Sequence, residues 1–420
     1  MSAVSDDLAK DTGKSAGKIG ISLLIAIGLG YVLTLVVSRV LEPEVNKVFL
    51  SFWGVLMGLG SALSPLEQEI SRQSAVAALD GGRAGKPALR AITVGGLVVA
   101  VVSALSLIPA ATDRLFGGDP VLALLVLLGG VSFACQFGTR GLFIGQNRVR
   151  QFSWLILAEA AIRIVVLGAL VVASIAHLVP LAIAATAGSF AWLFFARPAA
   201  KLVDPHLDGE SWRPITGRIL LLMLGAGLTA SVITGYPAMV NLLAPGGDGA
   251  QLATLFLALT VARIPLMLMS PVQAIAVPTV VRLSSTDEGL HKLRRYLVLG
   301  AFGTIAVGAI GALVGLLIGP WLIQLLYGAK YAAEGWWVAG LVWSSVLIAA
   351  IQLMTAVLVA QTRANKVLIT WAVVAVSTAL TLVLMPGDTI LRAVVGLIVG
   401  PTLGLAVVTA FVVRKPAPVG

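Results

Sequence analysis

The sequence predicts an all-α polytopic membrane protein of about 12 transmembrane helices, in two six-helix halves related by a pseudo-two-fold axis along the membrane normal. Three observations predict this fold class. Hydrophobic residues make up 58% of the 420 residues, charged residues only 11%, and the mean hydropathy is +1.00. Soluble domains carry about 25% charged residues. The apolar residues also form runs of about 20, the length that spans a bilayer. Finally, most basic residues lie between these runs, in segments that are predicted to face the same side of the membrane.

About twelve apolar runs are long enough to be transmembrane helices. They cover residues 18–40, 45–66, 90–111, 120–144, 152–175, 178–196, 217–243, 250–276, 296–319, 335–360, 366–385 and 389–413. A polar tail of residues 1–17 precedes the first run, and a second tail of residues 414–420 follows the last. The first run has no small-residue cleavage site after it, so we interpret it as a retained span and not as a signal peptide.

Lys and Arg residues orient the predicted spans. If residues 1–17 are cytoplasmic, the cytoplasmic segments receive about 22 of the 29 basic residues and the outer loops about three. This bias predicts that both termini are cytoplasmic. It also explains the formal net charge of +10 without a nucleic-acid partner, which a basic soluble protein would suggest.

A polar segment, residues 197–216, is predicted to be a cytoplasmic linker between two lobes, residues 18–196 and 217–413. A repeated Ser-Pro pair, Ser64-Pro65 and Ser270-Pro271, supports two parallel halves, which is a common transporter plan.

Three prolines lie in or near the predicted spans: Pro65, Pro265 and Pro271. We expect them to act as helix hinges, because proline removes a backbone hydrogen bond and bends a helix. The alternative is that they only shape the packing of these helices.

No motif for catalysis or for a cofactor is present. The loops hold no phosphate-binding loop, no HExxH sequence and no set of nucleophile, histidine and acid. The single cysteine, Cys135, lies in an apolar run, and the three histidines lie far apart in the sequence, so we expect no metal site. An enzyme with a site in the bilayer would need several facing acids, and Glu159 is the only acid that we predict to be deeply buried. We therefore predict a protein that is not an enzyme and has no cofactor.

Charged residues inside the predicted spans are the candidate site. Glu159 and Arg163 are spaced i, i+4, which favours an ion pair on one helix face. Arg163 lies about 16 Å from one end of its span and Arg263 about 20 Å into its own, so both lie near the membrane midplane. Charges at this depth usually face a partner or a cavity. Arg263 has no acid within one turn, which makes it the stronger candidate for a ligand contact; locking helices together is the alternative.

Charged residues at span ends have simpler interpretations. Arg39 and Arg392 lie close to the outer ends of their spans, where long side chains reach the interface. Glu67 and Glu69 lie at the inner end of the second span and are expected to form an interfacial network with Arg72. Arg140, near the end of the predicted span 120–144, is counted with the cytoplasmic side. With almost no deep acids to balance them, the deep arginines suggest passage of an anionic group, for which the planar guanidinium is well suited.

Four segments in their order along the chain carry a resemblance to a known family. They are VVSRVLEPEVNKVF (36–49), FIGQNRVRQFSWLILAEAAIR (143–163), LALTVARIPLML (257–268) and GPWLIQLLYGAKY (319–331). Together they resemble the polysaccharide (O-antigen type) flippases of the multidrug/oligosaccharidyl-lipid/polysaccharide exporter superfamily. The resemblance implies a twelve-span fold of two six-helix halves in the bacterial plasma membrane.

The resemblance also implies a function. Such flippases move an undecaprenyl-diphosphate-linked oligosaccharide, an anionic lipid-linked sugar, from the inner to the outer leaflet by alternating access. Arg263 would then meet the diphosphate in a cationic cavity, with Arg163 and Arg39 as further candidates and Glu159 as an ion-pair or coupling residue. The implied partners are membrane lipids, with a polysaccharide polymerase and glycosyltransferases left open.

Two alternatives to this function stay open. One is another secondary transporter, either of the major facilitator type, which the segment AALDGGRAGKPALR (77–90) partly resembles, or a drug/cation antiporter. Antiporters of this superfamily usually rely on buried acids, and the scarcity of such acids argues against them. The other alternative is a non-transporting scaffold in an envelope polysaccharide synthesis complex, in which the arginines only lock helices.

Overall fold

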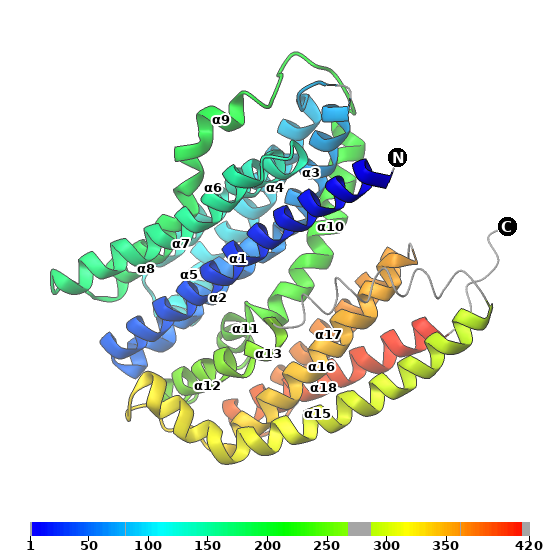
Figure 1. Cartoon of the computed structure of the whole chain (residues 1–420). Helices are drawn as coiled ribbons and strands as arrows, with labels where there is room; N and C mark the ends of the chain where they lie inside the picture. Colours follow the sequence, from blue (N-terminus) through cyan, green and yellow to red (C-terminus); the bar gives the residue numbers. More distant parts are fainter. Residues whose placement is uncertain (1, 80, 268–286, 362, 414–420) are drawn as a thin grey trace. The chain divides into compact units, whose positions relative to one another are not determined.

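The structure is a computed structural model, and it describes residues 2–79, 81–267, 287–361 and 363–413 (Figure 1). Within these residues the regular secondary structure is helical, apart from one isolated parallel bridge between Ala84 and Val203. Eleven of the described helices are long and apolar enough to span a membrane. The protein is therefore a multi-pass, all-helical membrane protein, as the sequence predicts.

Backbone contacts divide the chain into two compact units, Met1–Ala230 and Ser231–Gly420, called unit 1 and unit 2 below. The α-helices of unit 1 are α1 (Ser2–Val40), α2 (Pro43–Ala62), α3 (Ser64–Leu79), α4 (Lys86–Ala104), α5 (Pro109–Phe116), α6 (Pro120–Gly145), α7 (Val149–Val172), α8 (Leu178–Ala187), α9 (Ala196–Ala200) and α10 (Trp212–Ile233), the last of which continues into unit 2. Two short 3₁₀ helices, η1 (Leu105–Leu107) and η2 (Gly188–Phe195), complete this unit.

Helix α6 lies at the centre of unit 1 and packs against α2, α3, α4, α8 and η2. Small residues on α6 allow these close contacts. A Cβ atom added at Gly141 would lie 2.6 Å from the backbone oxygen of Glu67 in α3. Glycine is required wherever two backbones approach this closely in a membrane bundle. Side chains on α6 therefore face several neighbouring helices inside the unit.

The helices of unit 2 that the structure describes are α11 (Tyr236–Leu243), α12 (Gly249–Ala262), α13 (Ile264–Met267), α15 (Asp287–Tyr327), α16 (Gly335–Ala360), α17 (Ala364–Leu384) and α18 (Thr389–Val413). Helix α16 packs against α12, α15 and α18, and α17 packs against α18. The tyrosine hydroxyl of Tyr236, which is buried, donates to the carbonyl of Ala393 at 2.6 Å and joins α11 to α18.

Most of the expected spans match observed helices within a few residues, but four differ. The expected span 45–66 corresponds to α2 and α3 together, which continue to Leu79, and the expected span 296–319 lies within the longer helix α15. The expected span 217–243 is interrupted, because α10 ends at Ile233 and α11 begins at Tyr236. The expected span 250–276 begins with α12, an apolar helix of 14 residues that ends at Ala262. Residues 268–276 lie outside the described part of the chain.

The three predicted hinge prolines have different positions. Pro65 is in the first turn of α3, just after α2 ends at Ala62. Pro265 belongs to the short helix α13, and Pro271 lies outside the described residues. Whether any of them acts as a hinge stays a prediction.

The polar segment that was expected to link two lobes is bound to the connection between α3 and α4 within unit 1. The amide of Ala84 donates to Leu202 O at 2.9 Å, and the amide of Asp204 donates to Ala84 O at 2.8 Å. The amide of Lys86 donates to Leu207 O at 3.0 Å, and the Lys86 ammonium pairs with Asp208 at 2.6 Å. These contacts make residues 202–208 part of the fold of unit 1.

Candidate functional site

Arg163 and Glu159 form the ion pair that their spacing predicts. Both lie on α7, and Arg163 Nη2 is 2.7 Å from Glu159 Oε1. The Nε of Arg163 donates to the carbonyl of Ala185 in α8 at 3.0 Å. Only 8% of Arg163 is exposed. A buried charge is tolerated when an opposite charge and hydrogen bonds replace its lost solvation, and both are present here.

Three further residues complete the surroundings of this pair. The amide of Gln136 on α6 donates to Glu159 Oε2 at 2.6 Å. The rings of Trp53 and Phe133 lie 5.4 and 5.8 Å from the guanidinium carbon of Arg163, within the range of cation–π attraction. Arg163 also lies over Gly188, the first residue of η2, where an added Cβ would be 2.5 Å from Arg163 Nε. Glycine at this position therefore makes room for the guanidinium.

A second buried ion pair joins α3 to α6. Glu67 Oε2 is 3.0 Å from Arg140 Nε, and their side chains are only 17% and 14% exposed. The rings of Phe137 and Phe152 lie 4.6 and 5.5 Å from the guanidinium carbon of Arg140. Arg140 lies on α6, within the predicted span 120–144 and near its end. The expectation that Glu159 is the only buried acid was wrong.

We call Glu67, Gln136, Arg140, Glu159 and Arg163 the buried ionic cluster. Its members come from α3, α6 and α7, and Glu67 and Glu159 are close enough to influence one another electrostatically. Two carboxylates balance two guanidinium groups, so the cluster is formally neutral. The i, i+4 spacing of Glu159 and Arg163 on α7 indicated one part of it, and the same spacing of Gln136 and Arg140 on α6 is the sequence signal that could have indicated the rest.

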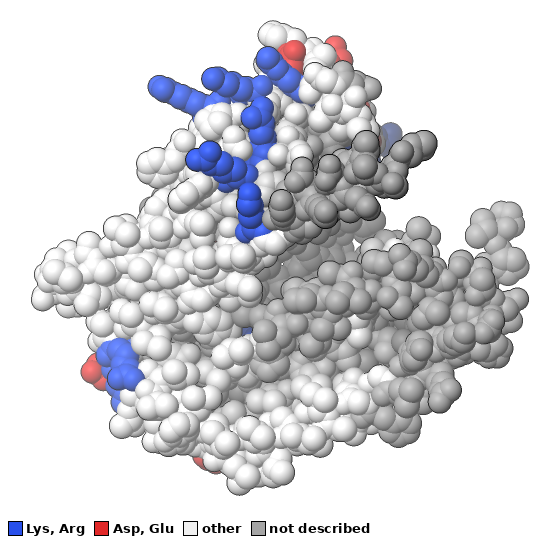
Figure 2. All heavy atoms as spheres, viewed as in Figure 1, with Lys and Arg blue, Asp and Glu red and all other residues white. Residues whose placement is uncertain are grey.

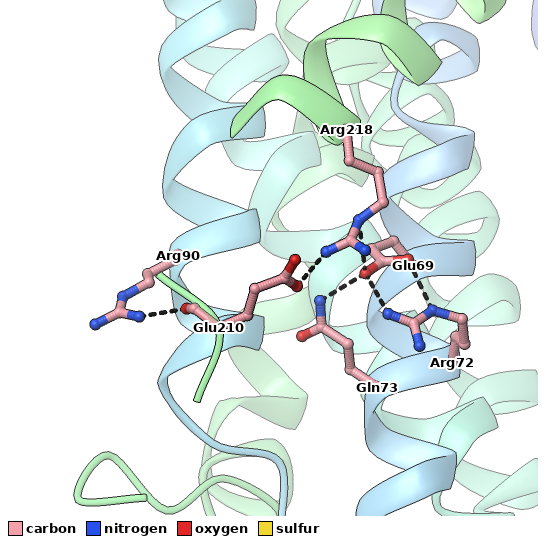
Figure 3. A network of polar contacts seen from close by, with 6 residues as sticks. All are labelled: Glu69, Arg72, Gln73, Arg90, Glu210 and Arg218. Atoms are coloured by element: carbon pink, nitrogen blue, oxygen red, sulfur yellow. Dashed lines mark hydrogen bonds and ion pairs between the residues drawn. The ribbon is translucent and has the colours of Figure 1, made fainter. Parts of the chain in front are cut away.

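A separate network surrounds Glu69 in unit 1, as Figure 3 shows. Glu69 accepts hydrogen bonds from Arg72 at 2.8 and 3.0 Å and from Gln73 at 2.8 Å. Arg218 on α10 lies 3.3 Å from Glu69 and also pairs with Glu210. The expected network of Glu67, Glu69 and Arg72 is present in part: Glu69 pairs with Arg72 and the network extends to α10, whereas Glu67 pairs with Arg140 instead. The network around Glu69 holds helices together and leaves Glu69 7% exposed.

Arg263, the leading candidate from the sequence, lies directly after α12 in unit 2. Its Nη2 donates to the carbonyl of Val232 at 2.8 Å, in the last turn of α10. The last four carbonyls of a helix have no partner within the helix and carry partial negative charge. Arg263 therefore caps α10 at the point where the expected span 217–243 is interrupted. Its side chain is half-buried.

Arg39, the third predicted arginine, is in the last turn of α1 and is exposed. This agrees with its position at the end of a span and leaves its role in binding a prediction. No three His, Cys, Asp or Glu side chains come close enough to hold a metal ion within the described ranges. The candidate site thus consists of the buried ionic cluster in unit 1 and of Arg263 in unit 2.

Comparison with curated proteins identifies relatives over nearly the whole chain. The uncharacterised protein Rv1510 of Mycobacterium tuberculosis is 31% identical over 414 residues, which cover 96% of this chain and 92% of that protein. The uncharacterised protein Rv3630 of the same species is 30% identical over 404 residues, with 94% and 90% covered. No family model matches the chain.

Solved structures with the same fold are membrane transporters. An inward-facing multidrug resistance MATE family transporter of the MOP superfamily matches with a TM-score of 0.70 at 15% identity, over 95% of this chain and 98% of that one. The lipid II flippase MurJ in an inward closed conformation matches with a TM-score of 0.66 at 12% identity, over 95% and 88%. The chain therefore belongs to one family with the mycobacterial proteins Rv1510 and Rv3630, and it has the fold of MOP superfamily transporters.

Proposed function

We propose that the protein is a flippase that moves an undecaprenyl-diphosphate-linked oligosaccharide from the inner to the outer leaflet of a bacterial plasma membrane by alternating access. Its fold, shared with a lipid II flippase and with MATE transporters, supports a transporter. The observation that carries the choice of an anionic substrate is Arg263, a guanidinium placed where two membrane-embedded helices are interrupted.

The interruptions at Arg263 are of the kind that transporters use for binding. Helix α12 ends at Ala262 and α13 begins at Ile264, while α10 ends at Ile233 and α11 begins at Tyr236. Interrupted helices near the midplane expose backbone groups and helix ends to a substrate. Arg263 belongs to the first interruption and donates to Val232 in the second. A movement of either helix end would therefore change the surroundings of the guanidinium.

The charge balance of unit 2 also favours an anion. The carbonyl of Val232 carries no net charge, so its contact with Arg263 is a hydrogen bond and not an ion pair. The sequences of α11, α12, α16, α17 and α18 contain no Asp or Glu. A diphosphate offers several oxygen acceptors, and a guanidinium binds such groups through two parallel hydrogen bonds. The exchange of a carbonyl for a phosphate oxygen would couple substrate binding to the capping of α10.

The test is reconstitution of the full-length protein in liposomes that carry the lipid-linked oligosaccharide. The fraction of sugar exposed at the outer face is measured for the wild type, Arg263→Ala and Arg263→Lys. We expect alanine to abolish exposure and lysine to retain a small part, because lysine keeps the charge but loses the planar donors. Arg392→Ala, an arginine in the first turn of α18 of the same unit, is the matched control and is expected to transport normally.

Unchanged exposure in both Arg263 variants at normal protein levels would contradict the assigned role of this residue. An inactive wild type would favour the scaffold alternative, in which the chain supports a polymerase or glycosyltransferases without transporting. We also propose that both termini are cytoplasmic, as the basic loops predict. If a cysteine introduced into either tail reacted with a membrane-impermeant reagent added outside intact cells, that orientation would be contradicted.

A drug/cation antiporter is the second candidate, and the likeness to MATE transporters favours it. Glu67 and Glu159 are the buried acids that such a function would use. Each, however, is paired with an arginine, so the cluster offers no net negative charge to a cationic drug. Efflux of an organic cation from the same liposomes, lost in Glu159→Gln and retained in Arg263→Ala, would establish the antiporter in place of the flippase.

A further inference from the structure

A pocket of about 290 Å³ opens at the surface of unit 1 beside the start of α7. It is lined by Arg150, Gln151, Trp154, Ala158 and Phe195. The first four residues belong to α7, and Phe195 ends η2. The spans Val149–Val172 and Leu178–Ala200 are adjacent in sequence and antiparallel, so the start of the first and the end of the second lie at the same membrane surface. The pocket therefore lies at one end of these two candidate spans, where a span meets the interface.

Its lining changes in polarity along the helix axis. Arg150, Trp154 and Ala158 are spaced i, i+4, i+8 and so form one stripe on α7. At 1.5 Å per residue the stripe runs about 12 Å from the helix end toward the membrane interior. It starts with a guanidinium, continues with an indole that is 57% exposed, and ends with a methyl group. A phospholipid has the matching order of phosphate, glycerol ester region and acyl chain.

The charge around this pocket is not balanced within the described residues. Arg148, Arg150, Arg197 and Lys201 are all exposed, and none of them takes part in an ion pair with a described acid. By contrast, Arg72, Arg140 and Arg218 of the same unit are each paired with a glutamate. Figure 2 shows Lys and Arg gathered over α9 and the adjoining helix ends, above a surface of uncharged residues.

We infer that this pocket binds the headgroup of an anionic membrane phospholipid, with Arg150 on the phosphate and Trp154 at the ester region. Basic pockets between transmembrane helices attract acidic headgroups, and tryptophan favours the interface. The four exposed cations supply the attraction, and the pocket supplies the position. The bound lipid is structural and belongs to the surrounding membrane, so this inference does not depend on the flippase proposal.

The experiment measures which lipids stay bound to the purified full-length protein. The protein is exchanged into mixed micelles that contain equal amounts of phosphatidylglycerol and phosphatidylcholine, and retained lipids are counted by native mass spectrometry. The wild type is expected to retain phosphatidylglycerol preferentially. Arg150→Ala should lower that preference about five-fold, the effect of losing one juxtamembrane cation. Trp154→Ala should lower the retention of both lipids and leave the preference unchanged.

Arg83→Ala is the matched control, because Arg83 is an exposed arginine of the same unit that does not line the pocket. Its preference should equal that of the wild type. If Arg83→Ala and Arg150→Ala lowered the preference for phosphatidylglycerol equally, the lipid would be attracted by diffuse surface charge and not bound in the pocket, which would overturn the inference. If millimolar inorganic phosphate displaced phosphatidylglycerol, the pocket would be a site for free phosphate, and the assignment of a phospholipid as its ligand would be overturned. A wild type without preference would overturn the inference altogether.

Discussion

Arg163 in unit 1 and Arg263 in unit 2 are both arginines in the interior of predicted spans, yet their surroundings differ. Arg163 is paired with Glu159, donates to Ala185 O and lies near two aromatic rings. Arg263 donates to Val232 O at a helix end and remains half-buried. The first arginine is neutralised by a carboxylate, and the second is satisfied in part by a neutral carbonyl.

The difference teaches how to separate a structural charge from a functional one. A buried pair contributes mainly by preventing the cost of an isolated charge, so removing one member should destabilise the protein strongly. An arginine on a carbonyl can exchange that contact for a phosphate oxygen at little cost, because both are neutral or anionic acceptors. Unit 1 should therefore respond to mutation in its stability, and unit 2 in its activity.

The largest stability effect is expected for Glu159→Gln. It leaves Arg163 buried without its carboxylate, which should lower the free energy of unfolding by about 3–5 kcal/mol. Thermal or denaturant unfolding in detergent measures this. Glu159→Gln combined with Arg163→Gln should recover most of the loss, and Glu42→Gln, an exposed acid before α2, should change nothing. Wild-type stability in Glu159→Gln would remove the distinction between the two arginines.

The next effect is expected for Gly188→Ala. The added methyl would lie 2.5 Å from Arg163 Nε and 2.7 Å from the backbone oxygen of Glu159, so α7 and η2 must move apart. Overpacking of this kind costs about 1–3 kcal/mol. Gly168→Ala on α7 is the matched control, since an added Cβ there meets no described atom within 4 Å. The same unfolding assay should show Gly168→Ala unchanged or slightly more stable; equal losses would contradict the close approach.

Arg263→Ala should have a smaller effect on stability. The loss of a cation at the end of α10 costs about 1 kcal/mol. The same variant should lose flipping in the liposome assay, so its two readouts should separate. In Glu159→Gln, by contrast, any loss of transport should follow the loss of folded protein. A destabilisation of Arg263→Ala as large as that of Glu159→Gln would assign Arg263 to helix locking.

The smallest effect on stability is expected for the exposed ion pair of Lys86 and Asp208. This pair serves as a comparison for the buried ion pairs. The hydrogen bond and charge of Lys86 lower the pKa of Asp208 below its ordinary 3.8. Because the pKa of Asp208 is lower in the folded protein, the pair stabilises the 202–208 segment fully at pH values above 3.8. This stabilisation is lost as the pH falls through the lowered pKa.

Asp208→Asn should therefore increase amide hydrogen exchange of Asp204 and Lys86 near neutral pH, and the difference from the wild type should vanish in strong acid. Asp113→Asn, an exposed acid on α5, serves as the control. A difference that persists in strong acid would show that the carboxylate charge is not responsible.

Local features were predictable from the sequence, and contacts between distant segments were not. The Glu159–Arg163 pair follows from a spacing of four residues in one helix, which needs no knowledge of the fold. The Glu67–Arg140 pair joins α3 to α6, and nothing in either segment specifies the other. The backbone hydrogen bonds that join residues 202–207 to Ala84 and Lys86 were unpredictable for the same reason.

The sequence by itself determined that the chain is a helical membrane protein, because runs of about 20 apolar residues must satisfy their backbone groups as helices in lipid. It also determined that charges lie inside those helices. Only the tertiary structure decided which charges are neutralised. Apolar sequence is compatible with a continuous helix from 217 to 243, yet the chain breaks between Ile233 and Tyr236, and Arg263 donates to Val232 at that break. Such a contact depends on packing between segments distant in the chain, which composition and periodicity do not encode.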